Sequence, residues 1–585
     1  MRTATIGAVL ALGIVACSQT KRDFGSSDGG AGGEAGDTLT SGGTAGSAAS
    51  GGSHAGGGKP GSSGSSSEAG SDSEAGSNSE AGSESGNGPL TIVSVTPDGA
   101  TATTRDAISV TFSRAVTQAS ANAAIAISNG QGNVTGSLTI DGDVVHFTPR
   151  GSLCFDQKYT VSVADTVQTA DATKLDKPGS FSFRIPDGTW QDGIAVGTPV
   201  ANTTVPSVDL DLDGNAIAAW QEGSVVGVNY YDATKAAWNG VVRPTFDSQT
   251  PSMFNEVATK VRGTHAIALI VGWGTTETSN GKNWTQTSVD TFLGSSSYLG
   301  PAALAMTGDY SSALVWTDSH EGKPSSLWSG FHPAGAAWQA PTAAFVDPET
   351  YDFKVHELPD DSILAVYEHR LDQPTPGNVA ARRYTKSKGW SSEKQIAAGG
   401  PPLLAVDSFG NALMTSGTTL AARYDYESDS WTTMPNIAVT DDVMEFNLAL
   451  GGDGTAYAVY QGTTYTSTAN GSVSDTHVGV QRLVGKKWND EEIVMPHTGG
   501  NIALGGVTAD DCGDLTVVWT DYDKNISYAR RYTPNSGWLP TVTLTKVATY
   551  SSTDNIAGNA HGAVVVPYVS AEDGGNVAPR VKRFE

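Results

Sequence analysis

Apolar and polar residues alternate along most of the chain after residue 88, with the period of a half-buried β-strand. Between residues 89 and 186, runs of this kind are separated by Gly, Asp and Asn turns; they include Ile108–Phe112 and Tyr159–Val163. Short strands at this spacing predict a β-sandwich. The pattern continues to residue 585, so we expect an all-β protein.

Three motifs in the predicted sandwich point to a family. They are Val95-Thr96-Pro97-Asp98-Gly99-Ala100, Phe112-Ser113-Arg114-Ala115-Val116 and Phe181-Ser182-Phe183. The stretch 89–186 resembles the bacterial Ig-like domain of the S-layer (SbsA) type. The resemblance implies a spacer or adhesive module without catalysis. Cys154 has no partner inside this stretch, and we expect it to be a half-buried free thiol.

The rest of the chain, residues 187–585, is repetitive. Seven intervals over 348 residues separate eight tryptophans: Trp190, Trp238, Trp284, Trp338, Trp390, Trp431, Trp488 and Trp538. Between them recurs an Asp/Gly turn followed by alternating apolar residues. Its copies begin at Asp211, Asp309, Asp360, Asp407, Gly452, Asp511 and Asn559, with a degenerate copy at 263–273.

Each repeat therefore holds a hairpin, a third strand, a short turn and a fourth strand that carries the tryptophan. Four antiparallel strands in 40–50 residues are typical of a β-propeller blade. We expect eight blades, or seven if the degenerate second copy is an insertion. Because Trp190 precedes the first hairpin and no tryptophan follows the last, the strand near Trp190 should complete the final blade.

The N-terminus, residues 1–17, reads as a signal peptide, with a basic start and an apolar run from Ala4 to Val15. Its end, Ile14-Val15-Ala16-Cys17, resembles the bacterial lipobox. The resemblance implies that Cys17 carries the lipid, and that Ser18 favours retention in the outer membrane. The acyl chains would anchor the protein without spanning the bilayer.

The signal peptide is followed by a segment, residues 18–88, that has no hydrophobic pattern. From Gly25 onward it is almost entirely Gly, Ser, Ala, Asp and Glu. Such a segment buries too little apolar surface to fold, so we expect a disordered tether. A Gly/Ser coil of about 64 residues spans roughly 40–50 Å between its ends.

The charge balance narrows the partners. With 61 acidic and 35 basic side chains the formal net charge is −26, which argues against nucleic acid as a partner. Asp209, Asp211 and Asp213 have the alternate spacing of a calcium loop, yet Trp220 stands where such a loop carries a bidentate Glu. We favour a structural hairpin turn there and otherwise expect no cofactor.

An acidic residue follows the aromatic end of several hairpins: Glu222, Asp318, Glu368 and Asp521. These residues begin the loops between the second and third strands, on the face of a propeller that usually binds ligands. The longest such loops are 368–378, with His369, and 461–478, with Tyr465 and His477. A ring of acids and aromatics suits sugars or cationic peptides; the alternative is a set of solvated loop starts.

A short strand ending in Arg-Tyr also recurs, and supplies Arg382, Arg383, Arg423, Arg482, Arg530 and Arg531. The turns from Tyr384 to Trp390 and from Tyr532 to Trp538 loosely resemble those of sialidase-like propellers. The Asp box of that family is absent, so its activity does not follow. We interpret these arginines as blade residues first.

We therefore expect a monomeric, lipid-anchored outer-membrane protein that faces the cell surface or periplasm and touches the membrane only through its lipid. The favoured function is a binding or adhesion module for a glycan or an envelope or extracellular protein. The alternatives are a polysaccharide-degrading glycosidase or lyase with its site at the propeller mouth, and a scaffold in envelope assembly.

Overall fold

The computed structural model describes residues 88–585 with short gaps at 100, 104–105, 130–131, 151–152, 246–256, 272–273, 289–298, 319–325, 346–349, 370–376, 418–419, 440–441, 469–470, 499–500, 546–555 and 573–574. The predicted signal peptide, Cys17 and nearly all of the predicted tether lie outside these residues. Within the described part, no helix is long and apolar enough to cross a membrane.

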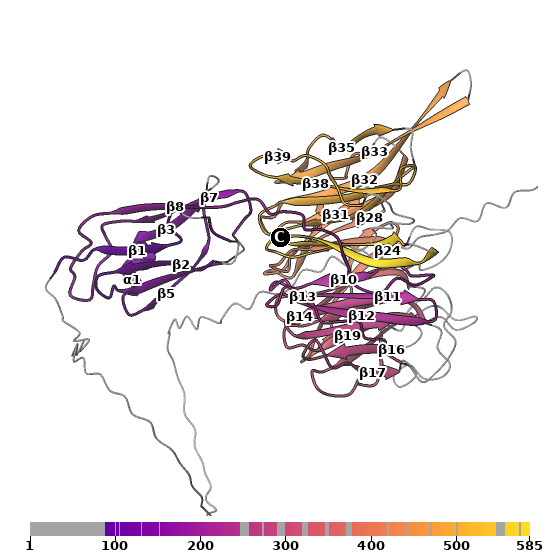
Figure 1. The fold of residues 1–585 in the computed structure, drawn as a ribbon, viewed down its shortest axis with the longest axis horizontal. Coiled ribbons are helices and arrows are strands. Elements are labelled where there is room, and N and C mark those ends of the chain that lie inside the picture. The colour runs from indigo at the N-terminus through magenta and orange to yellow at the C-terminus, as the bar shows by residue number, and fades with distance from the viewer. Residues whose placement is uncertain are drawn as a thin grey trace, which may run out of the picture. The chain divides into compact units, whose positions relative to one another are not determined.

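The first folded part is a sandwich of two four-stranded sheets (Figure 1). One sheet has the order β1 (Ile92–Thr96), β2 (Ile108–Phe112), β6 (Val144–Pro149), β5 (Gly136–Asp141). The other has the order β4 (Gly132–Asn133), β3 (Ile125–Asn129), β7 (Gln157–Val163), β8 (Gly179–Ile185), and a short helix α1 (Gln118–Ala124) precedes β3. Alternate residues such as Val110, Phe112, Val161 and Phe183 form one buried core, as the period of two predicted.

Eight further sheets follow, each built on a path of four antiparallel strands, and we number them blades 1–8. Blade 1 is β10 (Ser207–Leu210), β11 (Ala216–Glu222), β12 (Val225–Asp232), β13 (Ala237–Trp238); blade 2 is β14 (Val257–Arg262), β15 (His265–Ile270), β16 (Gly274–Thr278), β17 (Thr285–Ser288). Blade 3 is β18 (Leu299–Met306), β19 (Ser312–Asp318), β20 (Ser326–His332), β21 (Thr342–Phe345); blade 4 is β22 (Thr350–Glu357), β23 (Ile363–His369), β24 (Asn378–Thr385), β25 (Gly389–Trp390), with β26 (Lys394–Ala398) beside β24.

Blade 5 is β27 (Pro402–Val406), β28 (Ala412–Ser416), β29 (Leu420–Asp425), β30 (Ser430–Met434); blade 6 is β31 (Asp442–Leu450), β32 (Ala456–Thr468), β33 (Gly471–Val484), β34 (Lys487–Trp488), with β35 (Glu492–Thr498) beside β33. Blade 7 is β36 (Ile502–Ala509), β37 (Leu515–Asp521), β38 (Ile526–Thr533), β39 (Gly537–Trp538), with β40 (Val542–Thr543) beside β38. Blade 8 is β41 (Ala557–Gly558), β42 (Val564–Ala571), β43 (Val577–Phe584) and, from the other end of the domain, β9 (Ile194–Ala195).

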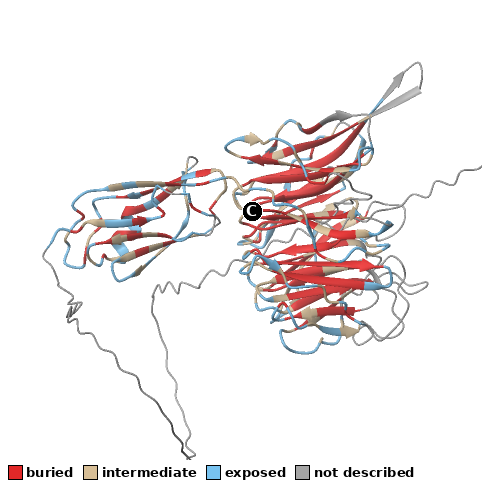
Figure 2. Cartoon of the chain, viewed as in Figure 1, coloured by how far each residue is buried: buried red, intermediate tan, exposed pale blue. Residues whose placement is uncertain are grey.

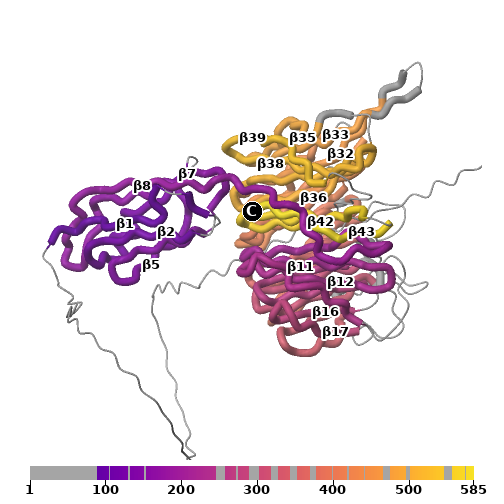
Figure 3. The backbone as a smooth tube through the Cα atoms, viewed as in Figure 1, coloured from indigo at the N-terminus to yellow at the C-terminus, as the bar shows by residue number. Residues whose placement is uncertain are grey.

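These sheets form a closed ring. The first strand of each blade contacts the first strand of the next, and β41 of blade 8 contacts β10 of blade 1. The last strands β42 and β43 accordingly lie beside β11 and β12 (Figure 3). The predicted eight-bladed propeller is confirmed, and so is the completion of blade 8 by the segment near Trp190, which bridges Phe584. The seven-bladed alternative is wrong, because residues 257–288 form a complete blade 2.

The recurring tryptophans explain how each blade holds its outer strand. In five blades the indole lies against an aromatic ring of the third strand, with centroids 5.2–5.5 Å apart: Trp190 on Phe584, Trp238 on Tyr231, Trp390 on Tyr384, Trp431 on Tyr424 and Trp538 on Tyr532. Such aromatic pairs add stability to a short edge strand that has few hydrogen bonds of its own. Second strands such as β11 and β37 are buried over their whole length, whereas outer strands such as β13 and β17 are half-buried or exposed (Figure 2).

The expectation of a free thiol at Cys154 is wrong, because Cys154 forms a disulfide with Cys512 of blade 7. The bond joins the Ig-like domain to the propeller. Around it, Ser536 donates to Asp156 over 2.6 Å, and Phe155 meets the edge of Phe584 with centroids 5.6 Å apart. The two cysteines are 358 residues apart in the chain, so only the folded arrangement brings them together.

We predict that Cys154→Ser/Cys512→Ser lowers the free energy of unfolding by about 2–4 kcal/mol, because the bond closes a very long loop in the unfolded chain. Calorimetry of the oxidised protein and the variant measures the shift in the unfolding transition. Peptide mapping without reductant should recover one linked pair of peptides that contains both cysteines. Recovery of both as free thiols would contradict the assignment.

Candidate functional site

The recurring Asp/Gly turns connect the first two strands of a blade, and we call them inner turns. In blades 1, 5 and 7 a single carboxylate organises the turn: Asp211, Asp407 and Asp510 each accept the backbone N–H four residues later over 2.8–2.9 Å. In each turn a glycine lies between the aspartate and the residue whose N–H it accepts. Its φ is positive, 84° at Gly214 and 86° at Gly410, and glycine is the residue that adopts such a φ most easily. The motif is thus explained by backbone geometry.

Burial makes these turn carboxyls weak acids. Asp211 and Asp407 are only 2% and 3% exposed. Burial raises the pKa of both to about 6, although hydrogen bonds from Asn215 and Asn411 oppose the change. In blade 7, burial raises the pKa of Asp510, and burial together with the charge of Asp510 raises that of Asp514.

The Asp209, Asp211 and Asp213 spacing serves the turn and the neighbouring blade. One oxygen of Asp209 accepts the N–H of Val261 over 2.8 Å, and Asp211 accepts the N–H of Gly263 over 2.7 Å. Both bonds tie blade 1 to blade 2. In the part of the chain that the structure describes, no group of three or more His, Cys, Asp or Glu side chains is placed to hold a metal ion.

Of the predicted ring of acids, the structure describes the side chains of Glu222, Glu368 and Asp521, and all three are buried. Glu222 is 7% exposed and binds Arg243 over 2.8 Å and the indole N–H of Trp220 over 2.8 Å. Asp521 is 4% exposed and accepts Lys524 Nζ over 2.6 Å, while Glu368 is 1% exposed. Asp318 and His369 end β19 and β23, and their side chains lie outside the described part of the structure. Glu222 and Asp521 therefore pair with cations of their own blades.

The expected loop 461–478 is instead part of a long hairpin. β32 and β33 pair without interruption from Ala456↔Leu483 to Thr468↔Gly471, and the hairpin projects from the propeller in Figure 1. His477 is 1% exposed and lies 2.8 Å from Glu491, whereas Tyr465 is 58% exposed. The Ser- and Thr-rich composition concealed the strand alternation.

Arginines on the third strands join several neighbouring blades. Their guanidinium groups lie over an aromatic ring of the next blade: Arg482 over Tyr532 at 4.4 Å, Arg531 over Phe584 at 3.9 Å, and Arg583 over Tyr231 at 4.0 Å. Cation–π contacts of this kind gain strength when they are shielded from water. Arg531 also binds Asp514 over 3.1 Å and pairs with Asp187. Arg482 and Arg531 are two of the recurring arginines that the sequence interprets as blade residues.

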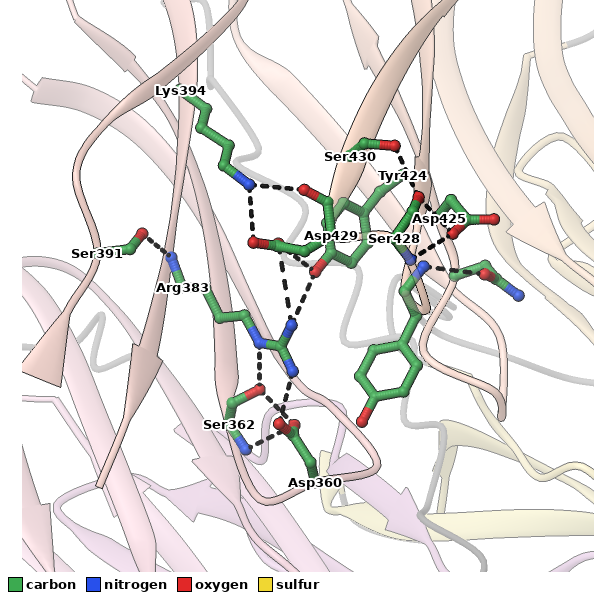
Figure 4. Close-up of polar contacts among 12 residues, drawn as sticks. Asp360, Ser362, Arg383, Ser391, Lys394, Tyr424, Asp425, Ser428, Asp429 and Ser430 are labelled. Atoms are coloured by element: carbon green, nitrogen blue, oxygen red, sulfur yellow. Dashed lines mark hydrogen bonds and ion pairs between the residues drawn. The ribbon is translucent and has the colours of Figure 1, made fainter. Parts of the chain in front are cut away.

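Figure 4 shows a polar cluster of this type between blades 4 and 5. Arg383 donates to Ser362 over 2.7 Å and to Asp360 over 2.5 Å, and lies 3.8 Å from Asp429. Lys394 holds Asp429 over 2.8 Å from the other side. Burial alone would raise the pKa of Asp360, but Ser362 and Arg383 outweigh it and lower that pKa. The cluster fastens two blades.

A polar pocket of about 370 Å³ adjoins this cluster on the side of blade 6. Blade 5 contributes Asp407, Phe409, Asn411, Arg423, Asp425 and Glu427; the inner turn of blade 6 contributes 452–454, and the Ig-like domain contributes Thr135 and Arg150. Of the charged residues Arg150, Arg423, Asp425 and Glu427 in this lining, only Arg423 is among the candidate residues predicted from the sequence. A signal was present in the Arg-x-Asp spacing of 423 and 425, which puts both side chains on one face of β29.

Comparisons with known proteins identify one domain. The model of the bacterial Ig-like domain matches residues 86–185, in agreement with the motifs that predicted it. No curated protein matches the chain.

Among solved structures, the Dos1 propeller matches at 9% identity over 68% of this chain and 95% of its own, with a TM-score of 0.42. A lectin from Burkholderia pseudomallei matches at 12% identity over 59% and 99%, with a TM-score of 0.39. An α-L-arabinanase from Penicillium chrysogenum, complexed with arabinobiose, matches at 13% over 50% and 98%, with a TM-score of 0.31. At these values we derive neither fold nor ligand from them; the propeller rests on this chain's own sheets.

We predict that Arg531→Ala lowers the free energy of unfolding by about 3 kcal/mol or more, because it removes a buried guanidinium that pairs with Asp514 and Asp187 and covers the ring of Phe584. Arg531→Lys should recover part of this loss. Arg184→Ala serves as the control, since Arg184 is 67% exposed in its pair with Asp156, and it should cost less than about 1 kcal/mol. Denaturant titration compares the three variants; equal losses for Arg531→Ala and Arg184→Ala would refute the prediction.

We predict a pH effect for Asp407→Asn. The folded carboxyl has a pKa of about 6 and an unfolded Asp titrates near pH 4, so the native state binds the extra proton in between. Wild-type stability from this group is therefore complete below about pH 4 and lost as pH rises through 6. The variant lacks this loss, so its stability relative to wild type should improve by about 2 kcal/mol between pH 4.5 and 6.5. Denaturant titration at both pH values tests it; a constant difference would be the contrary result.

Proposed function

We propose that this chain is a binding or adhesion protein, displayed at the cell surface by a lipid on Cys17, which recognises a glycan or an envelope or extracellular protein through its propeller. The tether of residues 18–88 provides reach from the membrane. We expect the protein to act as a monomer in the outer membrane.

The observation that supports binding over turnover is the use of the carboxyl groups of the inner turns and of Glu222 and Asp521. Asp211, Asp407 and Asp510, whose pKa values burial raises, are 2–4% exposed and accept backbone N–H groups of their own turns. Glu222 and Asp521 are held by cations within their blades. Glycoside hydrolysis needs two carboxyls that reach the substrate, whereas these groups are committed to the fold.

Exposed hydrogen-bonding groups remain between the blades, as the pocket beside Arg423 illustrates. A rigid ring that presents such groups is suited to recognition, because little side-chain freedom is lost when a ligand binds. The disulfide and the Arg531 network hold the Ig-like domain against the same ring. This arrangement favours one preformed binding surface.

The test is a polysaccharide and glycan panel, with retention and product release recorded in the same experiment. The full chain is purified in detergent and immobilised, and unfolded protein serves as the control. We expect retention on at least one polymer without release of products. Released oligosaccharides would instead establish an enzyme, and absence of retention on the whole panel would reject the glycan part of the proposal.

A further inference from the structure

The pocket beside Arg423 contains hydrogen-bonding groups that the fold does not use. Arg423 Nη1 donates a hydrogen bond to the carbonyl oxygen of Gly454 over 3.0 Å. Its Nε and Nη2 make no hydrogen bond among the described residues. Asp425 lies two residues further along β29. Its Oδ1 accepts hydrogen bonds from the backbone N–H and the hydroxyl of Ser428, over 2.8 and 2.7 Å, while its Oδ2 accepts no hydrogen bond among the described residues. A donor and an acceptor thus stand together on one strand face.

Asp425 is available as an anion. The hydrogen bonds from Ser428 lower the pKa of its carboxyl, and the charge of Arg423 adds to that effect. The residue is exposed, and Figure 4 shows it bonded to Ser428 at the edge of the cluster between blades 4 and 5. A ligand in the pocket therefore meets a charged donor beside a charged acceptor.

Two walls complete the pocket. On one side Arg150 of the Ig-like domain lies over the ring of Phe409, 5.2 Å from its centroid, and 3.3 Å from Glu427. On the other side Asp453 begins the Asp-Gly step of blade 6, and its carboxylate holds Thr455 over 2.8 Å. The absence of a side chain at Gly454 leaves space beside the guanidinium, because a Cβ there would lie 3.1 Å from Arg423 Nη2.

We propose that this pocket is a binding site for a neutral sugar residue, with Arg423 and Asp425 gripping adjacent hydroxyls and Arg150 and Phe409 closing over the ring. The proposal rests on the glycan-binding function above and names its site. A hydroxyl both donates and accepts, so neighbouring hydroxyls match a guanidinium next to a carboxylate. The volume of about 370 Å³ lies in the range of small-ligand pockets.

The charges of the lining select against other ligands. Asp425, Glu427 and Asp453 outnumber Arg150 and Arg423, and Asp407 lies beneath them. In a chain of net charge −26, such a lining disfavours acidic sugars and phosphates. Both guanidinium groups in turn disfavour a metal cation. A neutral polyol is the ligand class that can hydrogen-bond to both the carboxylates and the guanidinium groups of the lining.

The experiment uses the full chain in detergent and a panel of free glucose, galactose, mannose, fucose, N-acetylglucosamine and glucuronate. Saturation-transfer NMR identifies binders, and calorimetry measures their Kd. The test variants are Asp425→Asn and Arg150→Ala. The matched controls are Asp429→Asn, four residues along the same turn but outside the pocket lining, and Arg114→Ala, on the Ig-like domain in a pair with Asp171.

We expect at least one neutral sugar to bind, glucuronate to bind at least tenfold more weakly, and both test variants to weaken the neutral sugar at least tenfold. The controls should leave its Kd within about twofold. Polymer retention that persists unchanged in both test variants would overturn this site and leave the proposed function standing. Absence of retention and of sugar binding in the wild-type chain would overturn both.

Discussion

The pairing of β9 with β43 is the interaction on which the propeller depends, because a ring of sheets loses its open edges only when its first segment meets its last. The strand itself is two residues long, Ile194–Ala195, and is reinforced by bridges at Trp190↔Phe584 and Val200↔Val577. The segment must lie flat on blades 8 and 1. A Cβ on Gly193 would stand 1.9 Å from the Tyr568 hydroxyl, and one on Gly197 2.3 Å from the Trp220 ring. Glycine at both positions permits the closure.

Once the ring is closed, most of the polar chemistry in the described residues serves the contacts between blades. Asp209 and Asp211 bind the backbone of blade 2, Arg482 and Arg531 cover rings of blades 7 and 8, and Arg383 links blades 4 and 5. Stability therefore accounts for residue types that look functional in the sequence. The groups left for recognition are those, such as Asp425, that lie at the rim of such contacts.

The sequence predicts the fold well because its signals are local. Trp390 and Gly410 report a strand pair and a turn within their own blade, and eight copies of that evidence reinforce each other. The disulfide was missed because Cys154 and Cys512 lie in different domains, and no local pattern reports their distance. The ion pair of Glu222 was missed for a similar reason: its partner Arg243 lies beyond the next two strands, and sequence spacing does not show that the two side chains meet.

Ring closure also sets an order on folding. Blade 8 needs residues near 194 and near 581, so a growing chain can stack its earlier blades but cannot seal them until its final strands have been made. Until then β10 and β36 stand at the ends of an open array, with apolar faces and strand edges uncovered, and such species are prone to aggregate. The bond from Cys154 waits equally for blade 7. The propeller therefore closes only after the last strands have been synthesised. A chain truncated before β41 would remain an open array that is prone to aggregate.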